Sequence, residues 1–111
     1  MAADGIDPPV FSKEAGSGTK LIRREVKIVN KRGLHARAAA RFAKLAETFD
    51  VEIMVTGNGM MVSALSIMGL MMLGAGPGTS IQIAAAQEKQ AGAKKAVAAL
   101  SALVEAGFDE D

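Results

Sequence analysis

The segment GLHARAAARFAKLAETF spans residues 33–49 and contains the only histidine of the 111-residue chain. From Ala36 to Phe49, apolar residues recur at the spacing of an amphipathic helix. His35 therefore stands at the start of a predicted helix, just ahead of Arg37. The fold follows from this helix and from the extended segments on either side of it.

Alternating apolar and polar residues predict a strand before the helix and further strands after it. REVKIV (residues 24–29) precedes the helix, and VEIMVT (residues 51–56) follows it. Asn58-Gly59 then separates two alternating segments, which indicates a tight hairpin turn. TSIQIAAA (residues 79–86) is the last predicted strand.

Two more helices are predicted in the second half of the chain. The apolar residues 66–73 form a short one, with Ser66 as its N-cap and Gly74 just past its end. The Ala-rich residues 88–106 form a longer one that stops at Gly107. The order of the elements predicts an α+β sandwich with helices on one face of a largely antiparallel sheet.

The length of the chain suggests one domain, which we expect at residues 23–107. Residues 1–22 are rich in Gly, Ala, Ser, Asp and Pro and show no periodicity. We expect them to form a disordered N-terminal extension. Residues 108–111 follow the last helix and are predicted to be an acidic tail.

The composition excludes several kinds of site and partner. A chain without cysteine and with one histidine cannot build a disulfide, a thiolate site or a multi-histidine metal site, so we expect no metal and no cofactor. The net charge is +1, without the basic stripe that nucleic-acid binding requires. The apolar residues 67–75 are too few to span a bilayer, and the first residues do not resemble a signal peptide. We expect a cytoplasmic monomer without membrane insertion.

The residues around His35 favour phosphoryl chemistry. The start of a helix offers unpaired N–H groups and partial positive charge, which bind phosphate well. The same field, together with Arg37, favours the neutral imidazole, which is a competent nucleophile. The Arg37 guanidinium can hold a phosphoryl group through two oxygens. A lone histidine at a helix start is also compatible with a surface position or a helix cap.

Two segments resemble one known family. GLHARAAARF (residues 33–42) resembles the active-site segment G-[IL]-H-x-R-P-A of the HPr family, the histidine phosphocarriers of the bacterial phosphotransferase system (PTS). SIMGLMMLG (residues 66–74) resembles its regulatory serine segment, S-[IL]-x-x-[LV]-x-x-L-G. The separation of the two segments agrees as well, and the resemblance covers residues 23–105.

This resemblance implies a fold and a function. The fold is an open-faced βαββαβα sandwich, a four-stranded antiparallel sheet with three helices on one face. His35 is implied to accept phosphate on Nδ1 from phosphorylated enzyme I and to pass it to a IIA-type protein, with Arg37 neutralising the phosphoryl group. Ser66 is implied to be the site of an HPr kinase/phosphorylase where the lineage has one. The protein is then a phosphoryl-transfer intermediate rather than a free-standing enzyme.

The chain departs from the family pattern at two positions. Ala38 replaces the usual proline after the arginine, which leaves a backbone N–H in place and makes the loop less rigid. Leu65 stands before Ser66 where some members carry lysine, which leaves recognition by a kinase open.

The short predicted helix has almost no polar face, so part of its apolar surface should be exposed. Flexible methionines suit a surface that accepts several partners. We expect the partner interface to comprise Ile67, Met68, Met71 and Met72. The alternative reading is that methionines fill the core, and we expect this for about half of the group Met60, Met61, Met68, Met71 and Met72.

Two other functions remain open from the sequence. One is a regulatory binding protein of the same fold, whose phosphorylation state is read by partners without phosphoryl flux. The other is a small RNA-binding module, which the absence of Tyr and Trp disfavours. The sequence does not distinguish the sugar-transport branch from the nitrogen-related branch of the system.

Overall fold

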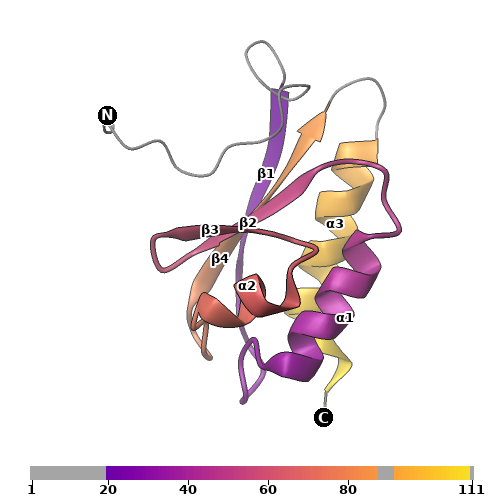
Figure 1. The fold of residues 1–111 in the computed structure, drawn as a ribbon. Coiled ribbons are helices and arrows are strands. Elements are labelled where there is room, and N and C mark those ends of the chain that lie inside the picture. Colours follow the sequence, from indigo (N-terminus) through magenta and orange to yellow (C-terminus); the bar gives the residue numbers. More distant parts are fainter. Residues whose placement is uncertain (1–19, 88–91, 111) are drawn as a thin grey trace.

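The computed structural model describes residues 20–87 and 92–110. Its elements are β1 (Lys20–Lys27), α1 (Ala36–Ala46), β2 (Ile53–Gly57), β3 (Met60–Ser63), α2 (Ile67–Met72), β4 (Ser80–Gln87), α3 (Gly92–Glu105) and a short 3-10 turn, η2 (Gly107–Asp109). The strands form one antiparallel sheet in the order β1-β4-β2-β3. The three α-helices lie on one face of it (Figure 1), which confirms the predicted sandwich.

Local signals in the sequence set the turns and caps. Asn58 and Gly59 both have positive φ, 50° and 80°, as the tight turn between β2 and β3 requires. The Ser66 hydroxyl accepts a hydrogen bond from the Gly69 N–H at 2.9 Å and so caps α2. Gly74 ends that helix with a φ of 63°. The predicted hairpin, N-cap and helix end are confirmed.

The two ends of the domain differ from the prediction. β1 begins at Lys20, and Leu21 and Ile22 pair with Ala86 and Ala85 of β4, so the boundary placed at residue 23 falls inside a strand. The predicted extension up to residue 19 lies outside the described residues. At the other end, Phe108 is fully buried in the core, so the domain continues past residue 107.

The first helix is shorter than its pattern suggests. α1 stops at Ala46, because Thr48 and Phe49 turn back to donate their N–H groups to Leu45 and Ala46. α3 is described from Gly92 to Glu105, within the predicted range 88–106, whose first four residues lie outside the description.

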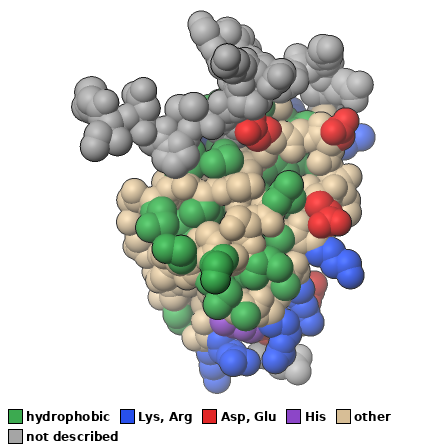
Figure 2. Space-filling view, viewed as in Figure 1, with side chains coloured by type: hydrophobic (Ala, Val, Ile, Leu, Met, Phe, Trp, Pro, Cys, Tyr) green, Lys and Arg blue, Asp and Glu red, His purple; other side chains and the backbone are tan. Residues whose placement is uncertain are grey.

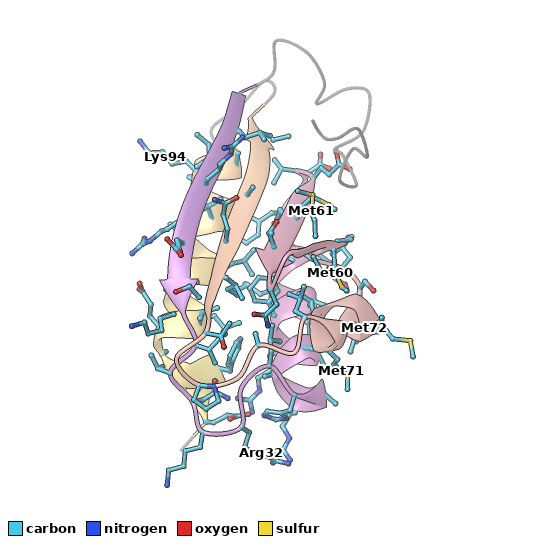
Figure 3. The ribbon with its side chains drawn as sticks, turned by 90° about the vertical axis from the view of Figure 1, so that its left-hand side faces the viewer. Arg32, Met60, Met61, Met71, Met72 and Lys94 are labelled. Atoms are coloured by element: carbon cyan, nitrogen blue, oxygen red, sulfur yellow. The ribbon has the colours of Figure 1, made fainter. Side chains whose placement is uncertain are left out.

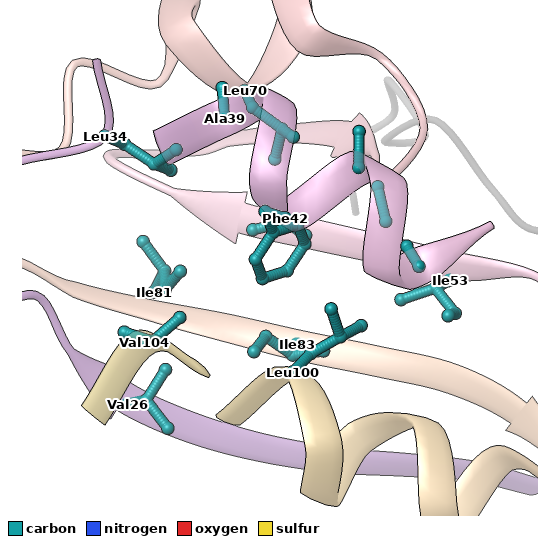
Figure 4. Close-up of a cluster of buried hydrophobic side chains, with 14 of the residues drawn as sticks. Val26, Leu34, Ala39, Phe42, Ile53, Leu70, Ile81, Ile83, Leu100 and Val104 are labelled. Atoms are coloured by element: carbon teal, nitrogen blue, oxygen red, sulfur yellow. The ribbon is translucent and has the colours of Figure 1, made fainter. Parts of the chain in front are cut away.

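The core lies between the sheet and the helices, with Phe42 of α1 at its centre (Figure 4). Leu100 of α3 and Ile83 of β4 face it from the other side, and all three side chains are fully buried. Each such side chain contributes about 1.5–3 kcal/mol relative to exposure. This packing fixes the position of α1, and with it the start of that helix. No helix within residues 20–87 and 92–110 has the length and apolar character to cross a membrane.

Candidate functional site

His35 occupies the N-cap position of α1. Its backbone is extended, with φ −81° and ψ −178°, and its side chain makes no capping hydrogen bond. A capping role for the imidazole is therefore not what the structure shows. The side chain is 17% exposed, so the ring is largely enclosed but remains reachable from solvent.

The first turn of α1 leaves backbone donors free. The Ala39 N–H donates to the His35 carbonyl at 2.8 Å, which is the first bond of the helix. The N–H groups of Ala36, Arg37 and Ala38 have no acceptor within the described part of the chain. Three unpaired donors beside an imidazole, at the positive end of an 11-residue helix, form a site for an anion.

The loop before His35 is held against the loop that follows α2. Gly33 has a φ of 67°, and the Leu34 N–H donates to the Ala75 carbonyl at 2.9 Å. A Cβ on Gly33 would lie 2.5 Å from the Ala75 oxygen, so only glycine fits here. The Asn30 amide donates to the Gly33 carbonyl at 2.8 Å. His35 is therefore presented by a loop with little freedom to move.

Cations surround this end of the molecule. Arg37 is exposed, and its guanidinium has no hydrogen bond or ion pair to any residue that the structure describes. Lys31, Arg32 and Arg41 are exposed nearby in the sequence. In the space-filling view, Lys and Arg side chains lie beside and below the histidine, and apolar side chains lie above it (Figure 2). The free Arg37 can therefore turn toward an anion bound at the start of α1.

One nitrogen of the His35 ring is already engaged. Nε2 forms a hydrogen bond with Oε2 of Glu110. Asn30 Nδ2 donates to the other carboxylate oxygen of Glu110 at 2.9 Å. Nδ1 of His35 has no partner among residues 20–87 and 92–110. The ring is thus oriented through Nε2, and Nδ1 is the nitrogen available for chemistry.

The Glu110 carboxylate is stabilised in its ionised form. Its pKa is lowered from the ordinary value of 4.5, first by the hydrogen bond from Asn30 and further by His35 and the charge of Arg32. Desolvation acts in the opposite direction and does not cancel this effect. A negative charge therefore faces His35 Nε2 at neutral pH.

The predicted interface residues form an exposed apolar surface on α2. We call it the α2 patch, and its exposed fractions are 43% for Ile67, 74% for Met68, 44% for Met71 and 65% for Met72. The Met72 side chain projects outward from α2 (Figure 3). Leu65, just before α2, adds a further 60% exposed side chain. An unpartnered apolar surface of this kind is typical of a docking site.

Sequence reasoning missed part of this site. Neither Asn30 nor Glu110 was predicted to approach His35, and no contact was predicted for Ala75. One signal was present near the end of the chain. Phe108 is a large apolar residue among acidic ones, and a buried Phe there brings the following residues onto the domain.

Comparison with known proteins places these features in a family. The family described as the PTS HPr component phosphorylation site matches residues 22–106. A phosphocarrier protein NPr from Shewanella violacea is 47% identical over 92 residues, covering 83% of this chain and 97% of that protein. A phosphocarrier protein HPr from Neisseria meningitidis is 40% identical over 90 residues, covering 81% and 98%. The crystal structure of an HPr from Thermoanaerobacter tengcongensis superposes with a TM-score of 0.72 at 37% identity, covering 81% of this chain and 98% of that one.

Proposed function

The chain belongs to the HPr family of the phosphotransferase system, and on that premise we propose that it carries a phosphoryl group on His35. The group comes from phosphorylated enzyme I, and ultimately from phosphoenolpyruvate, and passes to a IIA-type protein. The observation that carries this proposal is the unpartnered Nδ1 of His35 beside the free N–H groups of the first turn of α1. The protein acts as a carrier between enzymes, in the cytoplasm, and not as a free-standing enzyme.

The transfer needs no group beyond those two proteins. The Nδ1 lone pair of His35 attacks phosphorus, a new N–P bond forms, and the bond from phosphorus to the donor breaks with its electron pair returning to the donor. The proton on Nε2 stays in place, so the phosphorylated ring carries a positive charge. The reverse steps deliver the group to the next acceptor. Such transfers depend mainly on positioning and on electrostatic stabilisation of the phosphoryl oxygens.

Arg37 supplies the mobile cation in this scheme. Its guanidinium has no partner within the described residues and stands two positions into the same helix. A planar fork can hold two phosphoryl oxygens at once, whereas the backbone N–H groups of α1 contribute fixed donors. We assign Arg37 the role of clamping the group during its arrival and departure.

The α2 patch is the surface on which partner proteins dock in this proposal. Apolar side chains lie beside the histidine in the space-filling view (Figure 2), so a partner seated on them covers the phosphoryl acceptor. Methionines can repack against different surfaces, which suits a carrier that must meet both a donor and an acceptor.

Ser66 is proposed as a regulatory position. Its hydroxyl caps α2 and lies directly before the α2 patch, where an HPr kinase/phosphorylase could modify it. A phosphate there adds about −1.5 to −2 charges at the edge of an apolar docking surface. Docking of enzyme I would then require desolvation of an anion, which weakens binding.

The test is incubation with phosphoenolpyruvate and enzyme I, followed by intact mass measurement and an acid-lability check. We expect one acid-labile phosphate on the wild type and none on His35→Ala. Acid-labile phosphate retained by His35→Ala would overturn the proposal. Since the similar proteins carry the names HPr and NPr, the assay is run with enzyme I of the sugar-transport branch and of the nitrogen-related branch. The faster donor identifies the branch.

A further inference from the structure

The last residues of the domain form a built contact with the histidine, which we call the C-terminal clasp (residues 107–110). The C-terminal end of the chain lies beside the start of α1 (Figure 1). Glu110 of the clasp bridges His35 Nε2 and Asn30 Nδ2 with its two carboxylate oxygens. Its side chain is only 14% exposed, so this is an enclosed contact and not a surface encounter.

The backbone of the clasp is held in an unfavourable conformation. Gly107, Phe108 and Asp109 all have left-handed φ values, 67°, 58° and 61°. L-residues other than glycine rarely adopt this region, and such strain persists only where the surroundings impose it. Strain of this kind gathers at functional sites, and here it directs Glu110 at the proposed phosphoryl acceptor.

Two contacts impose that conformation. The Phe108 side chain is fully buried in the core, which anchors the middle of the clasp. Arg41 of α1 donates a hydrogen bond from Nη1 to the Phe108 carbonyl. Both contacts tie the clasp to the domain independently of Glu110, so the carboxylate is delivered to His35 by a framework that does not need His35 itself.

We propose that Glu110 is a positioning residue that holds His35 in the tautomer with the proton on Nε2, so that the Nδ1 lone pair is free to attack phosphorus. A carboxylate can only accept hydrogen bonds, and neutral imidazole carries one proton, so a bond from Nε2 leaves Nδ1 unprotonated. This inference rests on the proposed phosphocarrier function. It adds a residue at the opposite end of the chain from the His-Arg segment.

The same contact matters after the transfer. When Nδ1 bears the phosphoryl group and Nε2 keeps its proton, the ring is positive, and the Glu110 carboxylate faces that charge. An ionised acceptor forms a stronger hydrogen bond with a charged donor than with a neutral one. Glu110 therefore stabilises the developing positive charge on the ring as the N–P bond forms, without itself taking a proton.

The geometry also predicts the effect of Glu110→Gln on the His35 ring. A glutamine has one acceptor oxygen and one NH₂ group. Asn30 Nδ2 is held in place by its hydrogen bond to the Gly33 carbonyl, so it still donates to an oxygen of the side chain at position 110. The glutamine NH₂ then faces Nε2 as a donor, which moves the ring proton to Nδ1 and removes the nucleophilic lone pair.

The experiment measures the tautomer and the reaction separately. The ¹⁵N chemical shifts of the His35 ring, read from two-dimensional spectra of the full chain, report which nitrogen carries the proton. We expect Nε2–H in the wild type and in Glu110→Asp, and Nδ1–H in Glu110→Gln. Phosphorylation of Glu110→Gln by phosphorylated enzyme I should be slower by roughly 10-fold to 100-fold, the effect of losing one hydrogen bond to a charged group. Asp109→Asn removes the same charge one residue away from an exposed side chain, and it should match the wild type.

The outcomes separate this inference from the proposed function. Nδ1–H in the wild type, or identical ring shifts and rates in wild type and Glu110→Gln, would overturn the role of Glu110 while leaving the carrier function intact. A wild type that carries Nε2–H yet takes no phosphate from either enzyme I would overturn the carrier function alone. Because the wild-type shifts decide the tautomer, the test stands even if a variant fails to fold.

Discussion

The Leu34 N–H donates to the Ala75 carbonyl at 2.9 Å, and this bond joins the loop that presents His35 to the loop that follows α2. Gly33 makes the approach possible, because any larger residue would meet the Ala75 oxygen. The bond therefore links the start of α1 to the end of the helix that carries the α2 patch. This backbone contact helps to hold His35 and the α2 patch in a fixed relation.

Gly33→Ala should therefore destabilise the protein more than a glycine replacement in an open turn. Gly59 is a matched control, since its φ of 80° is also left-handed but nothing lies within 4 Å of an added Cβ. We expect about 1–2 kcal/mol of backbone strain in both variants, and a further loss of about 1–3 kcal/mol from the clash in Gly33→Ala. Urea unfolding measures the difference. Equal losses of stability in the two variants would show that the loop at Gly33 shifts to relieve the clash.

Arg37→Lys should not be a conservative change. Lysine keeps the charge but loses the bidentate fork, so transfer to and from His35 should slow, by roughly tenfold, while unfolding is unaffected. Arg23→Lys makes the same replacement at an exposed position on β1 and serves as the control. Stopped-flow phosphorylation by enzyme I gives the rates. Wild-type rates in Arg37→Ala would show that transfer does not need the Arg37 guanidinium.

Ala38→Pro restores the residue that is usual in the family. The Ala38 N–H has no acceptor within the described residues, so the proline costs no hydrogen bond there, and its fixed φ suits a first helical turn. We expect a gain of about 0.4–1 kcal/mol in the free energy of unfolding, through the unfolded state. The side chain is fully buried, so a marked loss in thermal or urea unfolding would mean that the ring is not accommodated.

Variants at Ser66 can separate its cap role from its regulatory role. Asp is a good N-cap and Ala is a poor one, so Ser66→Ala should lose about 0.5–2 kcal/mol of stability and Ser66→Asp little. The loss of activity should follow the opposite order, larger in Ser66→Asp than in Ser66→Ala. Ser66→Asp places a charge beside the α2 patch and should weaken enzyme I binding, an effect that added salt reduces. Calorimetric titration with enzyme I measures it. Unchanged affinity and rate in Ser66→Asp would leave Ser66 as a helix cap only.

The clasp should also show in the pH dependence of stability. Because the pKa of Glu110 is lowered on folding, its contribution is present above the ordinary value of 4.5 and is lost as the pH falls through the lowered folded-state pKa. His35 and Arg32 are the charged or titratable groups that act on it. Urea unfolding of wild type and Glu110→Gln across pH 2 to 7, the range about this value, checks it. The two curves should converge at the acid end, and a constant gap would contradict the assignment.

The local features of this protein could be predicted from its sequence. The turn at Asn58-Gly59, the Ser66 cap and the end of α2 at Gly74 depend on the dihedral preferences of single residues and on hydrogen bonds within a few positions. The place of His35 at the start of α1 follows from helical periodicity. The resemblance to known segments added the four-stranded open-faced topology and the expected role of the histidine, because two motifs at a matching separation are specific.

Only the tertiary structure decided what contacts His35. Glu110 lies 75 positions away and stands in a segment whose composition is that of a solvated tail, so no periodicity or propensity marks it. Its approach depends on the left-handed turn at residues 107–109 and on the burial of Phe108, where this segment packs against α3 and α1. The start of β1 at Lys20 has the same cause, since pairing with β4 extends the strand beyond its alternating residues. Contacts between distant segments depend on the path of the whole chain, which local preferences do not encode.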